Sequence, residues 1–142
     1  MKHVIQVPGV LPYEPFGFTN CVRFKDALYL SGISALDPEG KIVGTDIETQ
    51  TQETYRNIQK VLRAAGSDLD QILQMTSFIV DLPANGAGYV AVRKKILTRS
   101  GLYQRDSWRG GAHGSGASAR SAVHRRNVLK RDAIRRKRHA AQ

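Results

Sequence analysis

The chain has 142 residues and a formal net charge of +10, and a chain of this length corresponds to one domain. A large positive charge is typical of nucleic-acid-binding proteins, but here it is unevenly distributed. Residues 1–103 carry 11 Lys and Arg against 10 Asp and Glu, whereas residues 104–142 carry 11 against 2. We therefore expect a balanced domain at 1–103 and a basic tail at 104–142, so the total charge does not by itself make the domain a nucleic-acid binder.

Composition argues against membrane, secreted and metal-dependent proteins. No apolar run approaches the ~20 residues that a membrane helix needs, and Pro8 and Pro12 interrupt the segment where a signal peptide would lie. A single cysteine, Cys21, cannot form an internal disulfide and suits a reducing compartment. The sequence contains no CxxC, HExxH or His/Cys cluster. We predict a cytoplasmic protein without a membrane segment, a metal site or a cofactor.

Short apolar runs predict strands in the first third of the chain. The segment HVIQV at 3–7 is a candidate strand. The segment VRFKDALYLSG at 22–32 holds two apolar runs on either side of Lys25 and Asp26, which predicts a hairpin. In DPEGKIVG at 37–44, Pro38 and Gly40 favour a tight turn.

The clearest helical pattern lies at 46–66. Residues recur there every three or four positions and form one largely apolar stripe: Ile47, Thr51, Tyr55, Ile58, Leu62 and Ala65. Asp46 is the expected N-cap, and Gly66 is the expected stop.

The next segments complete an alternating order of strands and helices. ILQMTSFIVDL at 72–82 is apolar and β-branched enough for a central strand. PANGAG at 83–88 is typical of a loop, and YVAVRKKILTRSG at 89–101 predicts a second, shorter helix. The order β-β-α-β-α indicates an α+β protein with a mixed sheet and two helices on one face.

Over residues 17–103 the sequence resembles the RidA family of imine/enamine deaminases, also called YjgF-type proteins or endoribonuclease L-PSP. The resemblance rests on an apolar strand ending in Ser31-Gly32, the DPEGKIV turn, the QTQETYRNIQKVLRAAG helix and the TSFIVD strand. It implies a chorismate-mutase-like fold, assembly as a homotrimer with ligand clefts between subunits, and a small imine or enamine as substrate.

The resemblance also implies roles for particular residues. Arg120, in SARSAV, matches the arginine that clamps the substrate carboxylate, although one such match in an arginine-rich segment can arise by chance. Ser31 and Gly32 match the pair that orients the substrate, but a strand end also favours small residues. Phe18 stands where the family has tyrosine, and Arg93 stands near a cleft asparagine, unless it is a solvated residue of the outer helix face.

The C-terminal segment departs from the family pattern. The family places a catalytic glutamate about fifteen residues beyond its arginine, where this chain has Arg135, and Glu53 is the last glutamate. The Gly-, Ser-, Ala- and Arg-rich composition after residue 103 resembles an out-of-frame reading of a GC-rich gene. We therefore expect the C-terminal strands to be missing or replaced by a disordered or frame-shifted tail.

An alternative interpretation treats the tail as a nucleic-acid-binding arm. Residues 120–139 are rich in Arg and Lys, and 127–139 can form a short helix. Neutralising phosphates in this way gives weak, salt-sensitive binding without sequence preference. The chain would then be a non-catalytic ligand- or nucleic-acid-binding relative of the family, and a simple solvated tail is a third interpretation.

Overall fold

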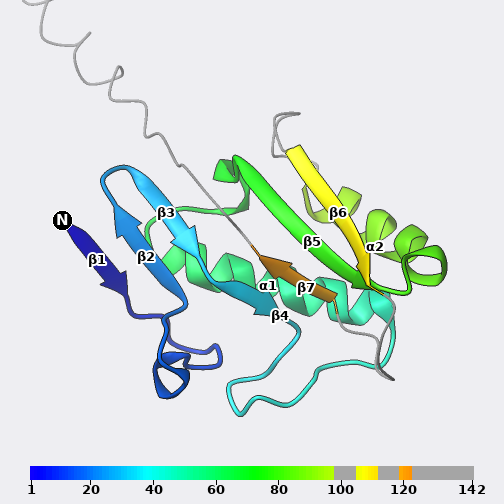
Figure 1. Ribbon diagram of the computed structural model, residues 1–142, viewed down its shortest axis with the longest axis horizontal. Helices are drawn as coiled ribbons and strands as arrows, with labels where there is room; N and C mark the ends of the chain where they lie inside the picture. The colour runs from blue at the N-terminus through cyan, green and yellow to red at the C-terminus, as the bar shows by residue number, and fades with distance from the viewer. Residues whose placement is uncertain (98–104, 112–118, 123–142) are drawn as a thin grey trace, which may run out of the picture.

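A computed structural model of the chain describes residues 1–97, 105–111 and 119–122, and it confirms the α+β class. Figure 1 shows the sheet with both helices behind it. The strands and helices are β1 (Lys2–Ile5), β2 (Cys21–Phe24), β3 (Ala27–Leu30), β4 (Gly32–Ser34), α1 (Ile47–Ala64), β5 (Gln74–Val80), α2 (Leu82–Ile96), β6 (Arg105–Gly111) and β7 (Ala119–Ala122), with short 3₁₀ helices at Glu14–Phe16 and Leu69–Gln71.

The strands form two hydrogen-bonded groups that meet at Ser31. One has the order β1-β2-β3 and is antiparallel, and its β2–β3 hairpin turns at Lys25, which has a φ of 54°. The other has the order β4-β7-β5-β6, in which β5 and β6 are parallel and the remaining pairs antiparallel. The predicted mixed sheet, hairpin and central strand β5 are confirmed.

Helix α1 follows the sequence pattern closely. Every residue of the expected stripe is buried, with exposed fractions between 0 and 7%. Asp46 Oδ1 accepts a hydrogen bond from the Thr49 amide at 2.7 Å, and Gly66 adopts a φ of +70° just beyond the helix. A second row on the same side is also buried although three of its members are polar: Gln50, Thr54, Asn57 and Val61.

Helix α2 corrects the expectation of a loop at 83–88. The helix begins at Leu82, and Asp81 accepts a hydrogen bond from the Ala84 amide. Pro83 is tolerated in the first turn because its missing amide hydrogen has no partner there. Gly88 lies against α1, where an added Cβ would be 2.7 Å from Ile47 Cγ2. The glycines that suggested a loop therefore include one required by helix packing.

Two strands lie in the segment that we expected to lack them. β7 inserts between β4 and β5, and β6 pairs with the other edge of β5. The expectation rested on side-chain composition, whereas strands in a sheet are held by backbone hydrogen bonds that any residue except proline can make. The separate tail at 104–142 stays a prediction, and the helix proposed for 127–139 lies outside the described residues.

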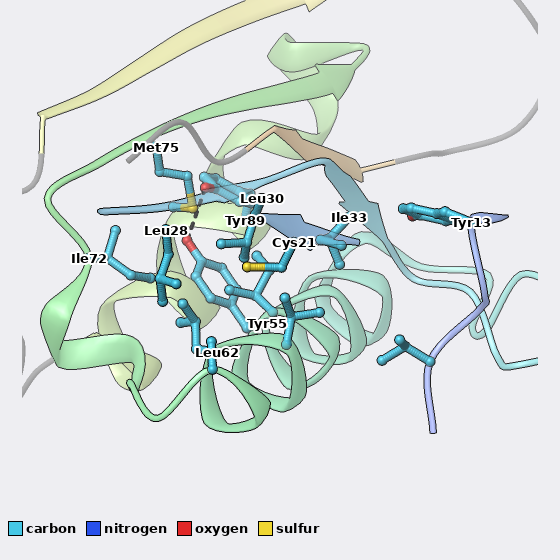
Figure 2. Packing of buried hydrophobic residues seen from close by; sticks show 14 of the residues in the cluster. Tyr13, Cys21, Leu28, Leu30, Ile33, Tyr55, Leu62, Ile72, Met75 and Tyr89 are labelled. Carbon is cyan, nitrogen blue, oxygen red and sulfur yellow. Dashed lines mark hydrogen bonds between the residues drawn. The ribbon is translucent and has the colours of Figure 1, made fainter. Parts of the chain in front are cut away.

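The core lies between the sheet and the helices (Figure 2), and it contains a buried chain of hydroxyl groups, of which the figure shows the Tyr55–Tyr89 contact. Tyr89 Oη lies 2.6 Å from Ser77 Oγ and 3.2 Å from Tyr55 Oη. These three residues, from α2, β5 and α1, are each 1% exposed. The hydroxyl chain therefore joins the two helices and the central strand. Each of its three buried hydroxyl groups has a hydrogen-bond partner, as is usual for buried polar groups.

Candidate active site

A groove of about 600 Å³ lies between the N-terminal loop, which connects β1 to β2 at residues 6–20, and the segment that runs from β4 into α1. These segments are the dark blue and cyan loops along the lower side of Figure 1. Most of the groove lining is apolar and comes from Leu11, Phe16, Phe18, Ile33, Leu36 and Ile42. Three of these side chains are strongly exposed, namely Phe16 (64%), Phe18 (49%) and Ile42 (64%). The groove has the size and character of a small-molecule site.

The N-terminal wall of the groove is fixed to the sheet by short polar contacts. Tyr13 Oη donates to the Gly32 carbonyl at 2.7 Å, and Ser31 Oγ donates to the Thr19 carbonyl at 2.5 Å. The Tyr13 ring also packs on Phe18, with centroids 4.7 Å apart. These contacts hold the aromatic residues of the loop beside the start of β4.

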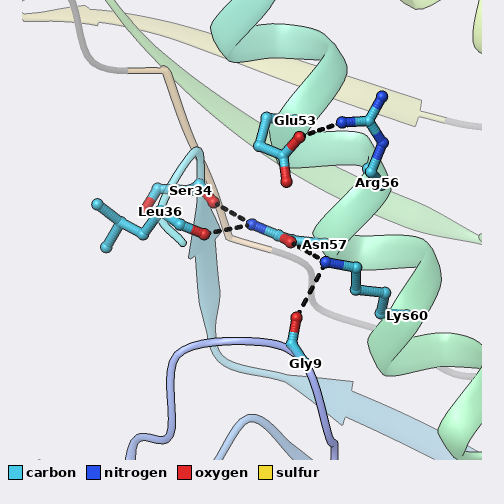
Figure 3. Close-up of polar contacts among 7 residues, drawn as sticks. All are labelled: Gly9, Ser34, Leu36, Glu53, Arg56, Asn57 and Lys60. Carbon is cyan, nitrogen blue, oxygen red and sulfur yellow. Dashed lines mark hydrogen bonds and ion pairs between the residues drawn. The ribbon is translucent and has the colours of Figure 1, made fainter. Parts of the chain in front are cut away.

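Helix α1 holds the opposite wall through Asn57 (Figure 3). Asn57 Nδ2 donates to the carbonyl oxygens of Ser34 at 3.1 Å and Leu36 at 2.8 Å. One turn along the helix, Lys60 Nζ donates to the Gly9 carbonyl at 2.9 Å. One face of α1 thus positions both walls, because Ser34 and Leu36 line the groove and Gly9 belongs to the N-terminal loop.

Gln50 is one of the residues that line the groove, and it is 3% exposed. Its Nε2 donates to the Gly44 carbonyl at 3.0 Å. Its Oε1 is buried and has no hydrogen-bond partner in the part of the chain that the structure describes. Gly44 itself has a φ of +84° and packs so tightly on Thr49 that a Cβ would be 2.8 Å from Thr49 Cβ. The side-chain amide of Gln50 is therefore hydrogen-bonded to a turn whose conformation is tightly constrained.

The first turn of α1 stabilises a negative charge near this wall. Hydrogen bonds from the Thr49 backbone amide, and then from the Thr49 hydroxyl, hold the pKa of Asp46 below its ordinary value of 3.8. The carboxylate is fully ionised at neutral pH and anchors the turn that carries Gly44 and Gln50.

The structure brings some of the expected site residues together and separates another. Phe18 and Gly32 line the groove, and Ser31 lies beside it with its hydroxyl bonded to the loop. Arg93 belongs to the last turn of α2 and does not line the groove. Arg120 belongs to β7, where the register pairs it with Ser34 of the groove wall.

Sequence reasoning missed Tyr13 and Gln50. Tyr13 places a phenol in the groove of a chain in which Phe18 lacks one. A signal for Gln50 was present, since it starts a polar row at helical spacing beside the apolar stripe, together with Thr54 and Asn57. Polar residues on a buried helix face are uncommon unless they have partners.

The part of the chain that the structure describes contains neither a candidate metal centre nor a helix suited to cross a membrane. Within 1–97, 105–111 and 119–122, no group of three or more His, Cys, Asp or Glu side chains is placed to hold a metal ion. No helix in these ranges combines the length and apolar character required to cross a membrane.

Comparison with known proteins gives one family. The model of the family described as Endoribonuclease L-PSP matches residues 12–124. This match includes β6 and β7 and ends before Arg135, the position at which the resemblance to the RidA family implies a glutamate.

Similar proteins carry several kinds of name. The chain is 43% identical over 56 residues to the putative regulator AldR of Lactococcus lactis, a match that covers 39% of this chain and 44% of that protein. It is 30% identical over 66 residues to the chloroplastic Reactive Intermediate Deaminase A of Arabidopsis thaliana, covering 46% and 35%. The matched region thus spans less than half the length of either relative.

Solved structures match over more of the chain. The structure of the Rid-family protein YyfA from Yersinia pestis superposes with a TM-score of 0.79 at 27% identity, covering 90% of this chain and all of that one. The order of elements described above is therefore that of Rid proteins.

Proposed function

Because the chain belongs to the endoribonuclease L-PSP family, also known as the RidA or YjgF family, we propose that it hydrolyses reactive imines and enamines. The substrates are of the 2-iminopropanoate and 2-aminoacrylate type, and the products are a 2-keto acid and ammonia. Water adds its oxygen to the imine carbon, the nitrogen takes up protons, and the carbon–nitrogen bond breaks as ammonia leaves.

The observation that carries this proposal is the groove beside Gly32. A small apolar groove with few polar groups suits a three-carbon imine better than a polymer. We propose that Arg120 binds the substrate carboxylate, a role supported by its register opposite Ser34 of the groove wall. Ser31 and Gly32 orient the substrate, and Phe18 packs against its apolar part.

We propose further that catalysis is weak in this chain. A positioned carboxylate that deprotonates the attacking water typically contributes ~10²–10⁴-fold to the rate. The family's glutamate has no counterpart, because Arg135 stands at that distance from Arg120 and Glu53 is the last glutamate. Turnover should therefore be at least ~100-fold below that of a relative with the complete site.

Assembly as a homotrimer is part of this proposal. The face of the sheet away from the helices carries exposed apolar side chains, among them Val4 (51%), Phe24 (44%) and Phe78 (42%). Contiguous exposed apolar surface often marks an interface. A mass of three chains in light scattering supports the trimer, and a monomer at micromolar concentration contradicts it.

Ammonia release tests the proposed reaction. Freshly generated 2-iminopropanoate is mixed with the protein, and the rate is compared with that of Arg120→Ala at the same concentration. We expect a raised KM in the variant, because the carboxylate loses its cation. A Lys94→Ala variant, which removes an exposed cation of α2, serves as the control for loss of charge alone.

A second candidate function rests on the charge distribution. The +9 net charge of residues 104–142 is what a phosphate-binding arm requires, and residues 120–139 carry most of it. Deleting residues 123–142 should then abolish retention on heparin. Retention that survives the deletion would place the binding surface elsewhere, and retention by neither protein would remove this candidate.

A further inference from the structure

Gln50 has an acceptor oxygen for which the protein supplies no donor among the residues described. The orientation of its amide is set by chemistry, since the group facing the Gly44 carbonyl must be the nitrogen. Oε1 is consequently the atom left to accept a hydrogen bond. A buried carbonyl without a donor is costly, and groups of this kind are retained where a ligand completes them.

The position of Gln50 distinguishes it from other buried polar groups. The hydroxyls of Thr19 and Thr54 also have no partner within the described residues, but neither residue lines the groove. Gln50 does line it, and the hydrogen bond from its Nε2 to the Gly44 carbonyl fixes the amide. The other polar atom of this lining discussed above, Tyr13 Oη, already donates to the Gly32 carbonyl.

We propose that Gln50 Oε1 accepts a hydrogen bond from the nitrogen of the bound ligand and so fixes which way the ligand lies. A carbonyl oxygen attracts an N–H donor and repels a carboxylate. The nitrogen end of the ligand then lies against α1, and the carboxylate lies toward β7. This inference rests on the proposed function, because it specifies how the imine nitrogen is held in the same groove.

The proposal makes Gln50 a specificity residue rather than part of the scaffold. A site built around a donor discriminates against an analogue that lacks it, since the buried acceptor would then stay unpaired. L-alanine and 2-methylpropanoate form a matched pair of probes, because they share the carboxylate and differ by an ammonium in place of a methyl group. The protein should bind L-alanine about tenfold more tightly.

The test measures both dissociation constants by NMR titration for the wild-type chain and three variants. Gln50→Met keeps the side-chain length but removes the acceptor, so the preference for L-alanine should fall to about one. Gln50→Glu keeps an acceptor and should retain or raise the preference. Ile42→Ala removes an exposed part of the groove wall and should weaken both ligands by a similar factor.

The outcomes separate this inference from the proposed function. A preference that survives in Gln50→Met, or that disappears equally in Gln50→Met and Gln50→Glu, overturns the role of Oε1. If Gln50→Met does not fold, a lost preference in Gln50→Glu alone has the same meaning. Ammonia release is scored separately, so a Gln50-dependent preference without turnover contradicts the proposed reaction and leaves the binding role in place.

Discussion

Two glycines of α2 offer a matched test of how the helices pack. Gly86 and Gly88 both lie inside the helix, and replacing either with alanine should raise intrinsic helix stability by about 1 kcal/mol. Their surroundings differ. A Cβ on Gly86 would be 3.1 Å from Leu82 Cδ1, the end of a flexible side chain, whereas one on Gly88 would be 2.7 Å from Ile47 Cγ2.

The expected magnitudes follow from these distances. Leu82 is partly buried and can shift by a few tenths of an ångström, so Gly86→Ala should be stabilising by up to about 1 kcal/mol. Ile47 is buried at the start of α1, and the added methyl also meets the Glu48 carboxylate. Overpacking of this kind costs about 1–3 kcal/mol, so Gly88→Ala should fall below Gly86→Ala by a similar amount.

Thermal unfolding followed by circular dichroism measures both variants against the wild-type chain. For a protein of this size, a difference of 1 kcal/mol corresponds to about 3 °C in Tm. Equal stabilisation by the two substitutions would refute the close approach of α2 to α1 at Gly88.

Three further perturbations test the core, the groove wall and the helix cap. Tyr89→Phe should cost about 1–3 kcal/mol in urea unfolding, because the hydroxyls of Tyr55 and Ser77 each lose a bond; no change would mean that the hydroxyl chain is not formed. Asn57→Leu should cost a similar ~1–3 kcal/mol and weaken ligand binding, since two carbonyls of the groove wall lose their donor. Unaltered ligand affinity would show that Asn57 does not determine the shape of the groove. Because the pKa of Asp46 is lowered in the folded state, its carboxylate stabilises the protein fully above pH 3.8, and this stabilisation is lost as the pH falls through the folded-state pKa. In Asp46→Asn, the free energy of unfolding should therefore decrease less on acidification than in the wild-type chain.

The sequence was sufficient for the elements whose side chains repeat with a clear period. The stripe from Ile47 to Ala65 predicted α1 with its cap and stop, and the β2–β3 hairpin and β5 were recognised from short apolar runs. Periodic patterns of this kind involve only residues close together in the chain, so the sequence alone is enough to recognise the helix or strand.

The elements that sequence reasoning missed depend on contacts distant in the chain. From the sequence alone, Gly88 is typical of a loop. Its place inside a helix is explained only by the close approach of Ile47, which leaves no room for a Cβ. β6 and β7 have little apolar periodicity and are formed by pairing with β5 and β4. In the groove, a polar row at helical spacing pointed to Gln50, but the missing partner of its Oε1 can be recognised only in three dimensions.

Turnover of 2-iminopropanoate by the purified 142-residue chain, beside a family member that has the complete arginine and glutamate pair, tests the central claim most directly. We predict ammonia release above the uncatalysed rate but at least ~100-fold below that of the intact relative, because the sequence has no glutamate after Glu53 to act as the proposed general base. Turnover within about tenfold of the relative would show that residues beyond β7 rebuild the site. A rate equal to that of buffer alone would contradict imine hydrolysis as the function of this chain.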